Sequence, residues 1–163
     1  MGSLTPVFHC ESLGFSALLT TEKSFFTRAL KRTFNGLDLP NKKYRVAVVF
    51  ADDATLRQLN RDFRHKDKPT NVLSFPQFDD FTQFDSLNDP IELGDIFLGF
   101  ETIAREAGAQ DKSLRDHVTH LLVHGLLHIM GYDHDTDKNA TQMEAFEIDI
   151  LTDLGIRNPY GEN

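Results

Sequence analysis

Residues 113–134 read SLRDHVTHLLVHGLLHIMGYDH, and this stretch predicts the helix around which the fold is built. Ser113 and Asp116 are three residues apart, which is the spacing of a side-chain cap at a helix start. Gly131 can end the helix because glycine adopts a positive φ without strain. We therefore expect a long helix from Ser113 to Met130, followed by a sharp turn.

This helix carries histidines at the spacing of a metal site. Residues four apart sit about 40° apart around a helix axis, so His124 and His128 project side by side. The turn at Gly131 would let His134 fold back and supply a third nitrogen. Three histidines leave one position of a tetrahedral zinc ion open for water or substrate, as in catalytic sites. The sequence thus predicts a site for one divalent ion, zinc or an alternative metal, with His124, His128 and His134 as ligands.

Other polar residues near this helix predict supporting roles. We expect His120 to pack against or orient the ligands, and His117 to face solvent. Gly125 stands where zinc peptidases of the His-Glu-x-x-His pattern have their catalytic glutamate, so peptidase chemistry lacks its proton acceptor here. Asp133 or Asp135 could replace that base, although Asp133 is better suited to orienting a histidine.

The rest of the chain alternates strand and helix patterns. Apolar runs predict strands at Thr5–Cys10, Arg45–Ala51, Val72–Phe75 and Asp95–Gly99, with Pro6 favouring a sheet edge for the first. Helical spacing predicts helices over Thr21–Phe34, from Asp52 or Asp53 to Phe63, over Phe100–Ala107, and from Thr141 to Leu154. These elements indicate an α+β fold, a mixed α/β sandwich in which a short mixed sheet packs with helices and a long central helix carries the metal-binding histidines.

One segment between these elements has a distinctive composition. Residues 77–93 hold five acidic residues and no basic one, and we expect a long exposed loop or flap there. In the helix that ends at Phe63, the apolar spacing predicts that Leu56, Leu59 and Phe63 point inward.

The overall composition is that of a globular chain. Its 163 residues, 40% hydrophobic and 26% charged, predict a single domain over residues 1–163 without a membrane-spanning segment. The formal net charge of −8 gives no general attraction for polyanions, so a nucleic-acid role requires a local basic patch. The one cysteine, Cys10, excludes an intramolecular disulfide and favours a reducing compartment such as the cytoplasm.

Such a basic patch exists between Arg57 and Lys68. This run has five basic and two acidic residues, a net charge of +3. A solvated helix face is the simplest interpretation of a charged run. Arg64, however, could bind a phosphate with both arms of its guanidinium and neutralise charge that develops beside the metal.

Two blocks of the sequence together resemble the bacterial YbeY family of endoribonucleases and rRNA maturation factors. The first is LNRDFRHKDKPTNVLSFP at Leu59–Pro76, and the second is HLLVHGLLHIMGYDH at His120–His134. Gly94-Asp95-Ile96 and Met143-Glu144-x-x-Glu147 extend the likeness, which spans about Val46 to Leu154.

The resemblance implies a zinc-dependent endoribonuclease specific for single-stranded RNA, which acts in rRNA maturation at the 3′ end of 16S rRNA and in ribosome quality control. His124, His128 and His134 would hold the zinc ion, and Arg64 would be the functional arginine of the cleft beside it. The implied partners are rRNA and proteins of the small ribosomal subunit, with no role for DNA or a membrane.

Two other functions fit the same residues. The first is a ribosome assembly factor that binds RNA through its basic run and uses zinc mainly as a structural ion. The second is a metal-dependent hydrolase of another substrate, such as a peptide or small amide, although the missing side chain at Gly125 weighs against it.

Overall fold

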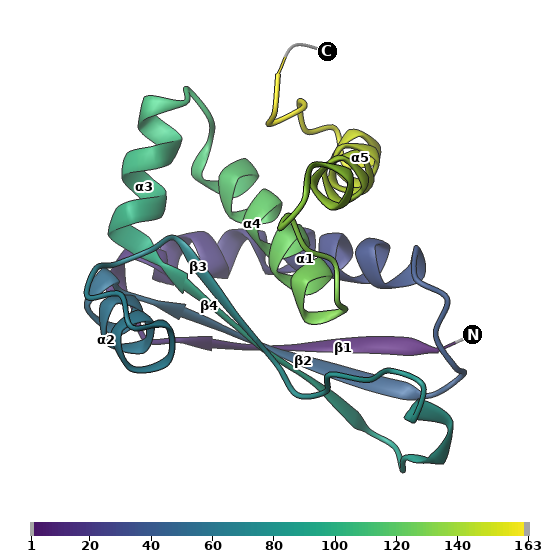
Figure 1. The fold of residues 1–163 in the computed structure, drawn as a ribbon. Coiled ribbons are helices and arrows are strands. Elements are labelled where there is room, and N and C mark those ends of the chain that lie inside the picture. Colours follow the sequence, from purple (N-terminus) through teal and green to yellow (C-terminus); the bar gives the residue numbers. More distant parts are fainter. Residues whose placement is uncertain (1, 162–163) are drawn as a thin grey trace.

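The computed structural model describes residues 2–161, so Met1 and residues 162–163 of the expected single domain lie outside the described part of the chain. A four-stranded sheet forms its centre, in the order β1-β2-β4-β3 (Figure 1). The strands are β1 (Ser3–Cys10), β2 (Lys43–Ala51), β3 (Val72–Pro76) and β4 (Ile91–Gly99). The helices are α1 (Leu13–Asn35), α2 (Asp53–Arg64), α3 (Phe100–Ala109), α4 (Leu114–Ile129) and α5 (Asp137–Asp153), with a short 3₁₀ helix, η1, at Phe84–Ser86.

The sheet is mixed, as predicted. Strand β2 pairs in parallel with β1 and with β4, whereas β3 runs antiparallel to β4. β1 lies at the sheet edge and has a neighbouring strand on one side only. Pro6, which has no amide hydrogen, is tolerated better there than in a central strand. Helices packed on a mixed sheet confirm the α+β expectation.

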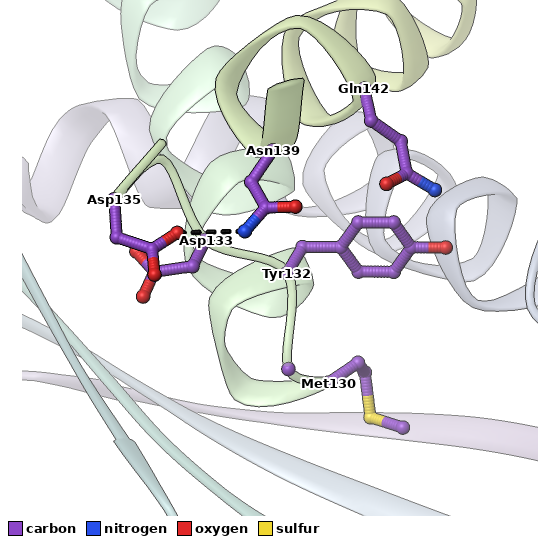
Figure 2. A pocket seen from close by; sticks show the side chains of 7 residues that line it. Met130, Tyr132, Asp133, Asp135, Asn139 and Gln142 are labelled. Atoms are coloured by element: carbon purple, nitrogen blue, oxygen red, sulfur yellow. Dashed lines mark hydrogen bonds between the residues drawn. The ribbon is translucent and has the colours of Figure 1, made fainter. Parts of the chain in front are cut away.

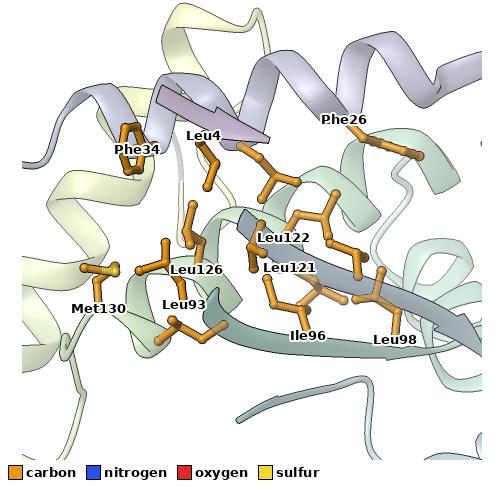
Figure 3. Packing of buried hydrophobic residues seen from close by; sticks show 14 of the residues in the cluster. Leu4, Phe26, Phe34, Leu93, Ile96, Leu98, Leu121, Leu122, Leu126 and Met130 are labelled. Carbon is orange, nitrogen blue, oxygen red and sulfur yellow. The ribbon is translucent and has the colours of Figure 1, made fainter. Parts of the chain in front are cut away.

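The helices divide unequally between the two faces of the sheet (Figure 1). Helices α1 and α4 cover one face, and α2 covers part of the other. On the first face, Leu122 and Leu126 of α4 pack with Ile96 and Leu98 of β4 in the main core (Figure 3). Helix α5 packs against α4 through a second cluster that includes Val123 and is separate from the main core. Helix α4 therefore lies between the sheet and α5, and only a narrow strip of it is available for polar side chains.

Several helices are longer than their sequence patterns suggest. Helix α1 begins after Ser12, and the hydroxyls of Thr20 and Thr21 donate to carbonyls one turn back instead of capping a helix start. Helix α5 begins after Thr136, whose hydroxyl accepts the amide of Asn139, whereas Thr141 lies inside the helix. At α4 the predicted cap is confirmed, because the Ser113 hydroxyl accepts the Asp116 amide. Among residues 2–161, no helix combines the length and apolar character needed to cross a membrane.

Two phenylalanines differ in burial from what the sequence pattern predicts. The sequence pattern predicts Phe63 in the core, but the side chain is 66% exposed, because the buried residues of α2, Leu56 and Asn60, come before its last turn. Phe84 lies in the expected exposed loop but is fully buried, and its ring packs against Phe78, Phe81 and Tyr44. The acidic segment is therefore anchored to the core by its aromatic side chains.

The burial of these two side chains predicts a large loss of stability for one substitution and a small one for the other. Phe84→Ala should lower the free energy of unfolding by about 3–5 kcal/mol, the cost of emptying a buried aromatic site. Phe63→Ala should change it by less than about 1 kcal/mol, because most of that ring is already in water. Urea unfolding followed by circular dichroism measures both values, and equal losses in the two variants would contradict the assignment of Phe84 to the core.

Candidate metal centre

The three predicted ligands meet at the carboxyl end of α4. His124 and His128 lie one turn apart on the helix, with ring centroids 4.5 Å apart. Their Nε2 atoms face each other at 3.0 Å. The ring of His134 lies 5.0 Å from that of His128 and 5.7 Å from that of His124. One nitrogen from each of the three rings lies within 4.8 Å of the others, which suits a small divalent ion.

The turn after α4 brings His134 to this position. Gly131 has φ of 94°, and the amides of Gly131 and Tyr132 return to the carbonyls of His128 and Leu127, which closes the helix end. The Asp133 carboxylate then accepts the backbone amide of His134 at 2.7 Å. The predicted glycine turn is present, and Asp133 contacts the backbone of His134, while its Oδ1 lies 3.9 Å from the Nδ1 atom of the imidazole.

Figure 2 shows the side chains that line a hollow beside this turn, among them Asp133 and Asp135, with Asn139 and Gln142 of α5. The hollow that they line has a volume of about 380 Å³. Asp135 accepts a hydrogen bond from the Asn139 amide at 2.8 Å, and this bond lowers the pKa of its carboxyl. A carboxylate held in its ionised form in this way is a weak proton acceptor, so Asp135 is a poor replacement for the missing glutamate.

A buried carboxylate on α5 orients the first ligand. Glu147 is fully buried, and its Oε1 lies 3.0 Å from His124 Nδ1 and 3.1 Å from His120 Nε2. The Tyr160 hydroxyl donates to the same carboxylate at 3.0 Å. These are hydrogen-bond distances, so the group formed by His120, His124 and Glu147 is a support for the metal ligand. A proton on His124 Nδ1, donated to Glu147, leaves the Nε2 lone pair free on the side of His128.

The acid–base properties of the cluster follow from this arrangement. Burial alone would raise the pKa of Glu147, but the hydrogen bonds and charges of His120 and His124 outweigh it and lower the pKa to about 2. Burial, together with the like charges of His124 and His134, lowers the pKa of His128 to about 4. Burial and the neighbouring Glu147 carboxylate raise the pKa of the Tyr160 hydroxyl. At neutral pH His128 is therefore neutral and able to bind a metal.

His117 is buried, which corrects its expected position. The sequence predicts this side chain in solvent, but it is 3% exposed and its Nε2 lies 2.9 Å from the Glu106 carboxylate of α3. Burial lowers its pKa despite that carboxylate. The error arises because α3, which covers this part of α4, cannot be located from the helix sequence alone. The expectation for His120, packing against and supporting the ligands, agrees with its contacts.

Gly125 has a packing role that explains the absence of a peptidase glutamate. A Cβ at this position would lie 3.1 Å from the side chains of both Ile96 and Ser74, closer than ordinary contact. The Ser74 hydroxyl of β3 donates to the Gly125 carbonyl at 3.1 Å. The backbone of α4 thus rests directly on the sheet at this point, and a glutamate side chain would fit there only if these neighbours shifted.

Arg64 lies outside the histidine cluster. It ends α2 and lines a separate hollow of about 350 Å³ together with Lys66, Lys68 and Glu106. Among residues 2–161, no hydrogen bond or ion pair joins Arg64 to the three histidines. Glu106 connects the two regions, because its carboxylate contacts His117 on α4 and accepts a hydrogen bond from Asn71 near the hollow.

Two histidines on a helix that packs on a mixed sheet, joined by a third from the turn after it, place the protein in the class of α+β proteins with a metallohydrolase-like site. The sequence model of the family described as Endoribonuclease YbeY matches residues 16–155. The chain belongs to this family, as the sequence motifs had indicated.

Curated relatives and a solved structure agree with this membership. The protein named Endoribonuclease YbeY from Paramagnetospirillum magneticum is 52% identical over 126 residues, which are 77% of each chain. Its namesake from Bartonella quintana is 42% identical over 152 residues, which cover 90% of this chain and 93% of the relative. The solution structure of TM1509 from Thermotoga maritima has a TM-score of 0.53 at 20% identity, covers 97% of this chain and 100% of its own, and supports the fold alone.

The contact of Glu147 with His124 predicts an effect on metal affinity. Glu147→Gln should weaken zinc binding about 10- to 100-fold, because a neutral amide orients the imidazole less strongly than a carboxylate does. Competition with a zinc-sensitive dye measures the affinity. Asp149→Asn, on the same helix and without a contact to the histidines, serves as the matched control and should bind zinc as the wild type does.

The pKa of His128 predicts how the stability of the metal-free protein depends on pH. The folded state binds this proton near pH 4, whereas the unfolded chain binds it near 6.5, so between these values the unfolded state holds more protons. The free energy of unfolding should therefore fall as the pH decreases from about 6.5 to 4. The contribution of Glu147 is lost at still lower pH, between 4.5 and about 2.

Urea unfolding at several pH values between about 7 and 4.5 tests this behaviour. His128→Asn should show a shallower dependence on pH than the wild type, because it lacks the group that gains the proton. Parallel curves for the two proteins would contradict the assignment.

Proposed function

We propose that this protein is a zinc-dependent endoribonuclease that cleaves single-stranded RNA, with His124, His128 and His134 as the ligands of one zinc ion. The convergence of these three imidazoles carries the proposal. Membership of the YbeY family, whose relatives are named endoribonucleases, supports the reaction class. By the same resemblance, we propose that the RNA is ribosomal, that maturation of the 16S rRNA 3′ end and ribosome quality control are its settings, and that small-subunit proteins of the cytoplasmic ribosome are partners.

The exposure of the ligands favours a catalytic ion over a structural one. His134 is exposed, and His124 and His128 are only partly buried. A structural zinc site is usually closed by four protein ligands, whereas three ligands at an accessible surface leave a position for water or substrate. When bound there, zinc lowers the pKa of a coordinated water and polarises a phosphoryl oxygen.

Two carboxylates position the proposed metal ligands for an RNA phosphodiester. Glu147 holds His124 so that its Nε2 atom faces His128. The Asp133 carboxylate accepts a hydrogen bond from the backbone amide of His134, which helps to hold the turn that carries the third imidazole. Because Gly125 carries no carboxylate, proton removal by a peptidase-type glutamate is absent, in agreement with a substrate other than a peptide.

Arg64 is the cation that we propose for the phosphate. Cleavage of a phosphodiester adds negative charge to the phosphoryl group in the transition state. A guanidinium can donate two parallel hydrogen bonds to such a group and remains charged throughout. Arg64 has no carboxylate partner within residues 2–161, so its donors are available to a ligand.

Two substitutions separate the metal from the arginine. His128→Ala should abolish both the zinc content and the cleavage of a labelled single-stranded RNA, because two imidazoles bind zinc too weakly. Arg64→Ala should keep its zinc but cleave about a hundred- to a thousandfold more slowly, the cost of removing one donor to a developing charge. Elemental analysis and gel-resolved cleavage provide the two readouts.

Arg61→Ala is the matched control, since this arginine lies on the same helix and contacts its neighbour Asp62. It should cleave RNA at the wild-type rate. Undiminished cleavage by purified Arg64→Ala and His128→Ala would show that another site performs the reaction.

A further inference from the structure

Phe63 is a large aromatic side chain that the core does not use. It lies on the last turn of α2 with 66% of its surface exposed. Its ring meets Phe75 of β3 in an edge-on contact, with centroids 5.4 Å apart, and Phe75 meets Phe97 of β4 in the same way at 5.7 Å. Phe75 and Phe97 are partly buried, so they support the row while Phe63 presents its ring to solvent. We call these three residues the aromatic row.

The basic hollow begins next to the aromatic row. Its cations are Arg64, Lys66 and Lys68, and Asn60 forms part of its wall. Arg64, which lines the hollow, directly follows Phe63 in the last turn of α2. The exposed ring and the hollow therefore begin at adjacent residues of the chain.

The charge that remains free on this surface is positive. The two acidic residues of the run are already engaged, since Asp67 pairs with Arg57 at 2.8 Å and Asp62 lies 3.5 Å from Arg61. Glu106, in the hollow wall, accepts a hydrogen bond from Asn71 and contacts His117. Within residues 2–161, the three cations of the hollow form no ion pair. In a chain of net charge −8, attraction for a polyanion is concentrated here.

We propose that the aromatic row and the basic hollow form a binding site for single-stranded RNA, in which phosphates lie in the hollow and a nucleobase stacks on Phe63. Each nucleotide of a single strand offers a phosphate and an unstacked aromatic ring. A surface that combines free cations with an exposed aromatic side chain matches both groups. An acidic protein segment would satisfy the cations but has no regular aromatic ring for Phe63. The proposal rests on the proposed function, because it adds a contact for the same substrate.

The position of the site relative to the histidines defines its role. Successive side chains of β3 point to opposite faces of the sheet, so Ser74 contacts α4 while Phe75 contacts Phe63. The aromatic row therefore lies across β3 from the helix that carries the metal ligands. A base that stacks on Phe63 belongs to a nucleotide other than the one whose phosphate Arg64 would contact at the cleaved bond, so loss of Phe63 should raise KM and leave kcat nearly unchanged.

A tryptophan reporter tests the stacking contact directly, because the natural chain contains no tryptophan. The fluorescence of Phe63→Trp should be quenched when single-stranded RNA is added. Leu13→Trp is the matched control: Leu13 is 95% exposed on α1, and its fluorescence should not change with RNA. Equal responses of the two variants would overturn the proposal.

Affinity measurements with a cleavage-resistant 2′-O-methyl RNA distinguish base stacking from charge attraction. For the zinc-loaded protein, Phe63→Ala should weaken binding about five- to hundredfold, whereas Phe63→Tyr should keep the wild-type affinity. An abasic oligomer of the same length, which has the phosphates alone, should bind Phe63→Ala and the wild type equally. If Phe63→Ala binds RNA as the wild type does, the site is not a base-stacking site, and a protein partner becomes the occupant to test.

Cleavage assays keep this result separate from the proposed function. An enzyme that cleaves RNA but does not depend on Phe63 for binding would overturn the stacking site alone. A protein that binds RNA through Phe63 but does not cleave it in its zinc-loaded form would overturn the proposed nuclease function and leave the stacking site intact.

Discussion

The close approach of α4 to the sheet at Gly125 is the constraint on which the site depends. Without a side chain at this position, the helix backbone rests against Ile96 and Ser74 and accepts a hydrogen bond from the Ser74 hydroxyl. This contact fixes the rotation of α4 about its axis. Once the rotation is fixed, His124 and His128 point away from the sheet toward α5 and the turn, where the third imidazole can reach them. The glycine that removes a peptidase base thus also determines where the metal ligands lie.

A second constraint comes from α5, which supplies the buried carboxylate of Glu147. A buried charge is costly unless it is fully hydrogen-bonded, and here His120, His124 and Tyr160 surround it. The same contacts tie α4, α5 and the chain after α5 to one another. Orientation of the metal ligand and the packing of the last two helices are therefore a single structural feature, and a change at Glu147 acts on both.

Patterns that are local in sequence predicted the central part of the site, and contacts between distant segments explain the errors. His124, His128, Gly131 and His134 lie within eleven residues, so helix geometry and one turn were enough to bring the three ligands together. His117 was placed in solvent because Glu106, its partner, comes from another helix. Phe63 was placed in the core because helical spacing shows which side of α2 is apolar but not how far along the helix the burial extends. Phe84 was placed in an exposed loop because the acidic composition of that segment does not show the aromatic rings that it contacts. For Glu147, the family motif marked the residue, but only the packing of α5 shows its contact with His124.

Strand β3 is short, lies at the edge of the sheet and separates the histidine helix from the aromatic row. Ser74 contacts the histidine helix, and the next residue, Phe75, belongs to the aromatic row on the other face. Because side chains alternate along a strand, insertion or deletion of one residue here would shift the pairing register and turn each side chain to the opposite face. A change of one residue inside β3 would therefore disturb both faces at once, whereas the loop between α2 and β3 can absorb a change in its length without turning the strand over.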